Sequence, residues 1–295
     1  MSSSAMTIPV SALPAHFALI ACQRTGSHLL REIINSNPSI ALLSEPFSRS
    51  ARPVNWQNYV KTLPADCFPP QFPDEAKTLL DGYMAAIERD VAMSCKWYGG
   101  PKPQLKALGI DVKYNQLRAA VPLFSDLRAR PFLLDYAASR QVRIVHLVRR
   151  DLVQTAISII VSNLRSVWQN YEGRTIEGRY RILPGQLFQY IAWVREERDE
   201  FTRLAQGLTM HTCAYEDVVE DLRRVDSAGI FPRDTVALGP LAEFLQAPNR
   251  FRFNGKIRKV INRPYAEILE NYDELMRAVS DSEFGEFAET MRAAA

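Results

Sequence analysis

The chain has 295 residues, of which 47% are hydrophobic, and this fits one large α/β domain or a core domain with a helical addition. It carries 36 Lys and Arg residues against 33 Asp and Glu residues, without a long basic block, which argues against nucleic acid as a partner. The four cysteines are widely spaced and form no Cys-x-x-Cys pair, so we expect no metal site. Free thiols suit a reducing compartment, so we expect the protein in the cytoplasm.

Residues 1–13 are expected to be a flexible, Ser-rich tail rather than a secretory signal, because they contain neither a basic nor an apolar region. No stretch approaches the roughly 20 apolar residues of a transmembrane helix, so no integral membrane segment is expected. Residues 14–295 are then expected to form a single domain.

The first predicted elements are a strand, a polar turn and a helix. The apolar run Phe17–Cys22 is typical of a parallel strand that is covered on both faces. Apolar residues then recur at helical spacing until residues 35–38 stop the helix. A second short strand is predicted over 40–43.

The rest of the chain gives clear elements only in its second half. We expect a helix over 74–90, a strand over 91–97, two helices over 115–139 broken at Pro131, a strand over 142–148, a helix over 152–168, a loop over 169–185, a helix over 187–204 and a strand over 208–214. Strands that alternate with helices imply a parallel, doubly wound sheet with helices on both faces. Ligands of such sheets bind beyond the carboxyl ends of the strands.

The first turn has the features of an anion-binding loop. Gly26 allows a tight turn and a close approach of the backbone, and the helix that follows offers unpaired N–H groups. Thr25 and Ser27 add hydroxyl donors, and Arg24 adds a fixed charge. The alternative is an ordinary joint between strand and helix that is capped by a serine.

This loop is not a Walker A loop, because Ser27 stands where the lysine is required and His28 where the metal-bound hydroxyl is required. It resembles instead the 5′-phosphosulfate loop of sulfotransferases that use 3′-phosphoadenosine-5′-phosphosulfate (PAPS), which reads [K/R]-[S/T]-G-[S/T]-[S/T]. Arg24–Ser27 fits this pattern, whereas His28 departs from it and would contribute its backbone N–H.

A second run of strand, basic turn and helix covers 143–158. Arg150 ends the strand and Ser158 lies about two turns into the helix, so an arginine that folds back along the helix would share a phosphate with the serine. Alternatively, Arg149 and Arg150 pair with acids. An arginine followed eight residues later by a serine resembles the family's 3′-phosphate site, and the form Arg-Arg-Asp resembles bacterial carbohydrate sulfotransferases of the trehalose 2-sulfotransferase-like and nodulation types.

Two further segments resemble the family less closely. Tyr215 begins a Tyr-Glu-Asp segment whose tyrosine borders the adenine in these enzymes, although a buried tyrosine with a capping acid pair is the alternative. Arg258 and Lys259 resemble the C-terminal Arg-Lys element that contacts the 3′-phosphate, although Val260 replaces the usual glycine and a solvated basic loop is the alternative.

Sulfuryl transfer needs a base for the acceptor hydroxyl and cations for the leaving phosphate, for which Arg24 is the candidate. Glu45 follows the second strand and resembles the glutamate proposed as base in related enzymes, and partial burial is expected to raise its pKa. The alternative is a loop carboxylate paired with Arg49 or Arg52, and His28 is the next candidate for the base. His146 and His211 lie within apolar strands and are expected to be core histidines.

The resemblance implies an α/β, three-layer P-loop-like fold with a central parallel sheet flanked by helices, and an enzyme that moves a sulfuryl group from PAPS to a small carbohydrate or glycolipid hydroxyl. The alternatives are a P-loop kinase-like nucleotide-binding protein and a non-catalytic PAP-binding module. The chain is compatible with a homodimer. The candidates for stacking on a sugar acceptor are Trp56, Tyr59, Trp97 and Tyr98. Lys96 is the candidate for a second cation near the transferred group, and the loop 169–185 is the candidate for a lid.

Overall fold

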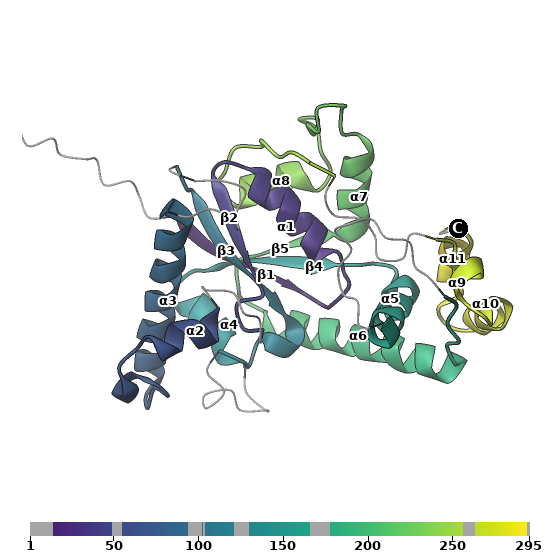
Figure 1. Cartoon of the computed structure of the whole chain (residues 1–295), viewed down its shortest axis with the longest axis horizontal. Helices are drawn as coiled ribbons and strands as arrows, with labels where there is room; N and C mark the ends of the chain where they lie inside the picture. The colour runs from purple at the N-terminus through teal and green to yellow at the C-terminus, as the bar shows by residue number, and fades with distance from the viewer. Residues whose placement is uncertain are drawn as a thin grey trace, which may run out of the picture.

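The computed structural model describes residues 14–48, 55–93, 102, 104–120, 130–165, 178–255 and 263–293. Within these residues, five parallel strands form one sheet in the order β2-β3-β1-β4-β5, flanked by helices on both faces (Figure 1). The strands are β1 (Ala15–Ala21), β2 (Ile40–Ser44), β3 (Ala107–Lys113), β4 (Arg143–Val148) and β5 (Met210–Ala214). The predicted α/β fold with a central parallel sheet is therefore confirmed.

The two faces of the sheet bury separate apolar cores, because successive side chains of a strand point to opposite faces. In β1, Leu19 packs into one core, whereas Ala18 and Ile20 pack into the other. The first core is covered by α1 (Ser27–Ser36), α7 (Tyr215–Arg223) and α8 (Leu238–Phe244). The second is covered by α3 (Pro73–Met93), α4 (Phe132–Ser139), α5 (Leu152–Arg165) and α6 (Pro184–Leu204).

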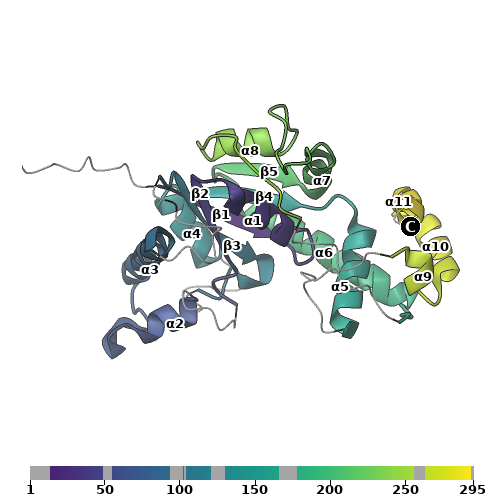
Figure 2. The same cartoon turned by 45° about the horizontal axis from the view of Figure 1, so that its top comes forward.

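The C-terminal helices lie beside α5 and α6 in both views of the chain (Figure 2). They are α9 (Tyr265–Ile268), α10 (Tyr272–Ser280) and α11 (Ala288–Ala293). The remaining elements are α2 (Trp56–Lys61) and the short 3₁₀ turns η1 (Ala65–Cys67), η2 (Tyr114–Gln116) and η4 (Gly285–Phe287). No helix in the described part of the chain has both the length and the apolar character needed to cross a membrane.

One predicted strand is wrong, and one strand of the sheet was not predicted. Residues 91–93 of the predicted strand belong to helix α3, while 94–97 lie outside the described residues. The strand β3 was not predicted, although it pairs with both β1 and β2 and so separates them in the sheet. Of the two helices predicted between 115 and 139, the second is α4, while residues 121–129 of the first lie outside the described residues and 114–116 form the 3₁₀ turn η2.

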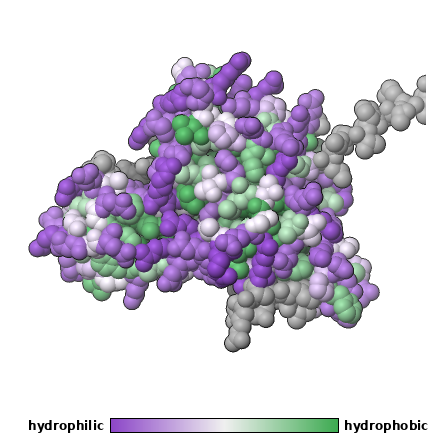
Figure 3. All heavy atoms as spheres, turned by 180° about the vertical axis from the view of Figure 1, so that it is seen from behind, coloured by the Kyte–Doolittle hydropathy of each residue, from purple (hydrophilic) through white to green (hydrophobic). Residues whose placement is uncertain are grey.

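Exposed apolar side chains are scattered over the described residues. The side opposite to the view of Figure 1 is mostly hydrophilic, with apolar groups between hydrophilic ones (Figure 3). The large apolar side chains that are exposed lie on separate elements: Phe72, Leu164, Leu183, Ile230 and Val236. Apolar residues scattered in this way are ordinary for a folded protein.

Candidate active site

Polar side chains gather at the carboxyl ends of β1, β3 and β4. The parallel register places Ala21, the last residue of β1, beside Lys113 of β3 and Leu147 of β4. The segments that follow these three strands therefore leave the sheet at the same edge. The phosphate loop, the turn η2 and the start of α5 meet there.

The phosphate loop has the tight geometry predicted from its glycine. Gly26 has a φ of 86° and caps helix α1. A Cβ atom at Gly26 would lie 2.3 Å from Cδ2 of Tyr215, so only glycine fits between the loop and that ring. Thr25 donates its hydroxyl hydrogen to the Cys22 carbonyl at 2.8 Å, which fixes the loop to the end of β1.

The two residues predicted to be catalytic both have a left-handed backbone. Among the described residues, only four non-glycine residues have a positive φ, and these are Arg24 at 63°, Glu45 at 40°, Gln141 and Gln246. Gln141 and Gln246 directly follow the ends of α4 and α8, where this conformation is common. Arg24 and Glu45 have no such explanation, and strain of about 1–3 kcal/mol each persists where the surrounding structure imposes it, often at functional sites.

Arg24 and Ser158, which lie 134 residues apart in sequence, are in contact: Nε of Arg24 donates to Oγ of Ser158 at 3.2 Å. Arg149 approaches the same loop, because its Nη1 donates to the Arg24 carbonyl at 3.5 Å. Its guanidinium lies 4.9 Å from the centroid of the Tyr215 ring. Burial and the charge of Arg149 lower the pKa of Arg24 to about 10. The structure thus joins two buried or half-buried cations, a hydroxyl and an aromatic ring from three of the predicted motifs.

Arg150 does not lie against Ser158 in the structure, and its contact with the 3′-phosphate stays a prediction. Its two terminal nitrogens donate to the carboxylate oxygens of Asp217 at 2.8 and 2.7 Å, and its side chain is 59% exposed. Glu216 accepts from the backbone N–H groups of Arg150 and Asp151 at 3.1 to 3.3 Å. The acids at the start of α7 hold Arg150, and the alternative weighed for it, pairing with acids, is the arrangement observed.

Glu45 lies against the phosphate loop, as its place after the second strand predicts. Its Oε1 is 3.4 Å from Nε2 of His28 and 3.8 Å from Nζ of Lys113, and its Oε2 accepts from Nε2 of Gln116 at 3.2 Å. Burial acts to raise the pKa of Glu45, but the His28 and Gln116 hydrogen bonds and the Lys113 charge outweigh it and lower the pKa to about 2. The expectation of a raised pKa is therefore wrong.

Lys113 is a site residue that the sequence interpretation did not find. It ends β3, is 4% exposed, and donates to Oγ of Ser27 at 2.8 Å. Asp111, which is fully buried, pairs with Lys113 on one side and with Arg31 at 3.4 Å on the other. The only sequence signal was a charged pair, Asp111 and Lys113, in an otherwise apolar run.

Several predicted site residues lie elsewhere. Trp56 is 3% exposed and its ring centroid is 5.1 Å from that of Tyr83, so it packs in the core instead of facing an acceptor. His146 is buried and hydrogen-bonded to Tyr114 at 2.6 Å, which confirms it as a core histidine. The predicted site, acceptor and pairing residues outside the described part of the chain are Arg49, Arg52, Lys96, Trp97, Tyr98, Arg258 and Lys259.

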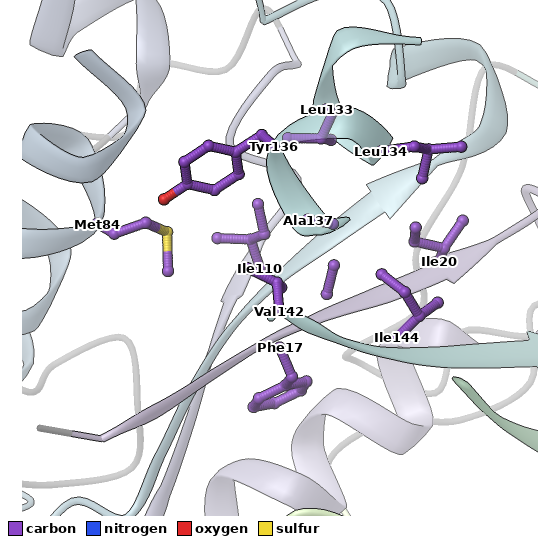
Figure 4. A pocket seen from close by; sticks show the side chains of 11 residues that line it. Phe17, Ile20, Met84, Ile110, Leu133, Leu134, Tyr136, Ala137, Val142 and Ile144 are labelled. Carbon is purple, nitrogen blue, oxygen red and sulfur yellow. The ribbon is translucent and has the colours of Figure 1, made fainter. Parts of the chain in front are cut away.

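A separate cavity between the sheet and helix α4 is not part of this site (Figure 4). Its walls are apolar side chains of β1, β3, β4, α3 and α4. The hydroxyl of Tyr136 donates to Asp81 at 3.0 Å, at the edge of the cavity. No charged side chain lines the cavity, so we interpret it as a packing space in the core. Among the described residues, no group of three His, Cys, Asp or Glu side chains could hold a metal ion.

Comparisons with known proteins give a relative of similar length among curated sequences and distant likenesses to solved structures, two of which are described below. No family model matches the chain. Nodulation protein H of Rhizobium meliloti is 21% identical over 283 residues, which cover 94% of this chain and 96% of that protein. This match confirms the resemblance to nodulation-type sulfotransferases that the motifs indicate.

The structural likenesses cover nearly the whole chain at low identity. The mouse sulfotransferase SULT7A1 complexed with PAP is 12% identical, with a TM-score of 0.42 over 97% of this chain and 91% of that one. The sulfotransferase domain from the Synechococcus PCC 7002 olefin synthase is 14% identical, with a TM-score of 0.40 over 97% of this chain and 96% of that one.

Proposed function

We propose that this chain, a sulfotransferase that uses PAPS, transfers the sulfuryl group to a hydroxyl of a carbohydrate or glycolipid. The observation that carries the proposal is the meeting of three separate motifs at one sheet edge: the loop at Arg24 and Gly26, Ser158 in α5, and Tyr215 at the start of α7. Motifs that are distant in sequence have no local reason to meet, so their convergence favours a shared ligand over three independent joints between strand and helix.

The donor would bind across the phosphate loop. Arg24, Thr25, Gly26, Ser27 and His28 would surround the 5′-phosphosulfate, with backbone N–H groups at the start of α1 pointing towards it. Ser158 would contact the 3′-phosphate and Tyr215 would border the adenine. Arg258 and Lys259 remain predicted ligands of the 3′-phosphate.

In the transfer step, the acceptor oxygen forms a bond to sulfur while the bond between sulfur and the bridging phosphate oxygen breaks. The proton of the acceptor hydroxyl passes to Glu45, and the electron pair of the broken bond leaves on adenosine 3′,5′-bisphosphate (PAP). Arg24 and Lys113 would meet the negative charge on the leaving phosphate and the sulfuryl oxygens. Because Glu45 is ionised at neutral pH, it is ready to accept the proton, and proton transfer accompanies formation of the new bond.

The acceptor class rests on resemblance. The Arg-Arg-Asp form of the second motif is similar to bacterial carbohydrate sulfotransferases, and the full-length relative is a nodulation protein. Both support an acceptor hydroxyl on a sugar or a lipid-linked sugar.

Calorimetry tests the donor. We expect PAP to bind tightly without metal and ATP to bind poorly, because the loop lacks the Walker lysine and metal-bound hydroxyl. ATP binding that equals PAP binding and requires magnesium would refute the proposal and favour the kinase-like alternative.

Transfer of labelled sulfate from PAPS to disaccharides, lipid-linked sugars and phenols tests the acceptor. Sulfation of sugars over phenols is expected. Tight PAP binding without transfer to any acceptor would favour the non-catalytic module.

A further inference from the structure

We propose that Arg149, and not Arg150, is the arginine of this turn that binds a phosphate of the nucleotide. The inference rests on the proposed function, because it concerns the same nucleotide site. The two arginines are neighbours in sequence and chemically identical, yet the structure gives them opposite surroundings.

The two side chains contact different parts of the molecule. Both residues lie in the turn between the end of β4 at Val148 and the start of α5 at Leu152. Arg149 points to the phosphate loop, where its Nη1 reaches the Arg24 carbonyl at 3.5 Å. Arg150 points to helix α7, where it meets Asp217. Only one of the pair therefore faces the site that contains Arg24 and Ser158.

The guanidinium of Arg149 is held in place without a salt bridge among the described residues, and the nearby Asp151 carboxylate acts on it only through its charge. The contacts of Arg149 are the amide oxygen of Gln154 at 2.6 Å, the Arg24 carbonyl and the face of the Tyr215 ring, all of which are uncharged. Its buried Nε has no hydrogen-bond partner in the described part of the chain. None of the ion pairs among the described residues includes Arg149. A dianionic phosphate would supply a direct ion-pair contact and the missing acceptor together.

The neighbouring guanidinium of Arg24 strengthens this reasoning. Two cations at one loop repel each other, and this repulsion contributes to the lowered pKa of Arg24. The repulsion turns into a shared attraction when an anion binds between them. Ser158, which already accepts from Nε of Arg24, lies beside that position.

Arg150 is held by the acids at the start of α7. Asp217 accepts from both of its terminal nitrogens, and Glu216 accepts from the backbone N–H groups of Arg150 and Asp151. The contacts of Glu216 fix the backbone of the turn, and they do not depend on the Arg150 side chain. The Tyr215–Asp217 segment would then act as one unit, with its ring on Arg149 and its acids on Arg150.

The two arginines serve as matched controls for each other. We would measure PAP binding by calorimetry to the wild type, Arg149→Gln and Arg150→Gln, with melting curves to confirm folding. We expect Arg149→Gln to weaken PAP binding by about 10- to 100-fold, as for loss of one charge-assisted contact, and Arg150→Gln to change it by less than about threefold. Arg149→Lys, which keeps the charge but loses the fork, should fall between wild type and Arg149→Gln and serves if the Gln variant does not fold.

Asp217→Asn adds a second test, because it releases Arg150 from its salt bridge. If Arg150 were the phosphate ligand, this release would tighten PAP binding, whereas we expect no tightening. Three results would overturn the inference. The first is a loss of PAP affinity in Arg150→Gln that equals or exceeds the loss in Arg149→Gln. The others are no loss in either variant, and tenfold tighter PAP binding in Asp217→Asn. A wild-type chain that does not bind PAP would refute the proposed function and the inference together, whereas a wild type that binds PAP keeps the two outcomes separate.

Discussion

The exchange of Glu45 for glutamine tests the proposed base most directly. Glutamine keeps the size of the side chain and part of its hydrogen bonding, but it cannot accept the proton. Because a positioned general base contributes about 10²–10⁴-fold, we expect turnover to fall by that factor. Nucleotide affinity should persist, since glutamine can keep a hydrogen bond to His28 and to Lys113, and the contact between Arg24 and Ser158 does not involve Glu45.

The stability of the same variant follows from the lowered pKa. The fold lowers the pKa of Glu45 from 4.5 to about 2, so its ionised form stabilises the folded state above pH 4.5, and this stabilisation is lost as the pH falls towards 2. At about 1.4 kcal/mol per pKa unit, the upper bound is about 3 kcal/mol at neutral pH. The Glu45 side chain is 26% exposed, which reduces that figure. A lower melting temperature alone therefore does not identify a base, and turnover per folded molecule must be measured.

The pH dependence of kcat/KM separates Glu45 from His28. With Glu45 as the base, the profile should stay flat as the pH falls from 8 to about 4, because Glu45 remains ionised. With His28 as the base, activity should fall as the pH drops below the pKa of His28. Burial lowers this pKa from 6.5, the charges of Arg31 and Lys113 also lower it, and the Glu45 hydrogen bond and the Asp111 charge oppose the shift.

The assay is single-turnover sulfate transfer at saturating PAPS, beside a melting curve. His28→Asn is the matched control variant. Near-native turnover of Glu45→Gln, or an acid limb that disappears in His28→Asn, would refute the assignment of Glu45.

Two further predictions concern packing in the fold. Gly26→Ala should destabilise the loop by about 1–3 kcal/mol and weaken PAP binding at least tenfold, because its Cβ would lie 2.3 Å from the Tyr215 ring. The control is Gly207→Ala, whose φ is also positive but whose Cβ meets nothing within 4 Å, and it should leave PAP binding unchanged. Equal losses of PAP binding in both variants would contradict this prediction. Burial lowers the pKa of His146 from 6.5 to about 4, so its contribution to stability is present above pH 6.5 and is lost as the pH falls towards 4. Urea unfolding should show a loss of about 2 kcal/mol between pH 7 and pH 5 that His146→Phe removes, and an unchanged pH slope in that variant would refute it.

Periodicity and apolar runs were sufficient to predict four of the five described strands. β1, β2, β4 and β5 are apolar runs that stop at polar turns, and such runs are predictable without knowledge of their neighbours. β3 carries Gly109, Asp111 and Lys113, which interrupt the run. Gly109 is required there because the Phe17 ring occupies the space of its Cβ, and Asp111 is buried because Arg31 and Lys113 neutralise it. Both reasons lie in distant segments, so sequence alone did not reveal this strand.

The same limit explains which site residues were found. The loop at Arg24 and Glu45 could be predicted because each directly follows a recognisable strand. Lys113 follows the strand that was not predicted, so its place at the same edge could not be inferred. The pKa of Glu45 was predicted in the wrong direction because burial alone raises it. The His28 hydrogen bond, the Lys113 charge and the Gln116 hydrogen bond lower it, and the last two come from β3 and η2, which were not predicted.

The two adjacent arginines after β4 cannot be told apart from the sequence. The motif predicts that one of them faces the ligand, but the local sequence does not distinguish Arg149 from Arg150. The choice depends on Asp217, which lies 67 residues after Arg150 and pairs with it across the β4 and β5 strand ends. If Arg149 binds the phosphate as inferred above, an acid at the start of α7 decides which arginine the phosphate meets. Spacing from Ser158 alone assigns the other arginine, Arg150. Where two arginines are adjacent in sequence, the position of nearby acids in the fold determines which of them remains available to bind a ligand.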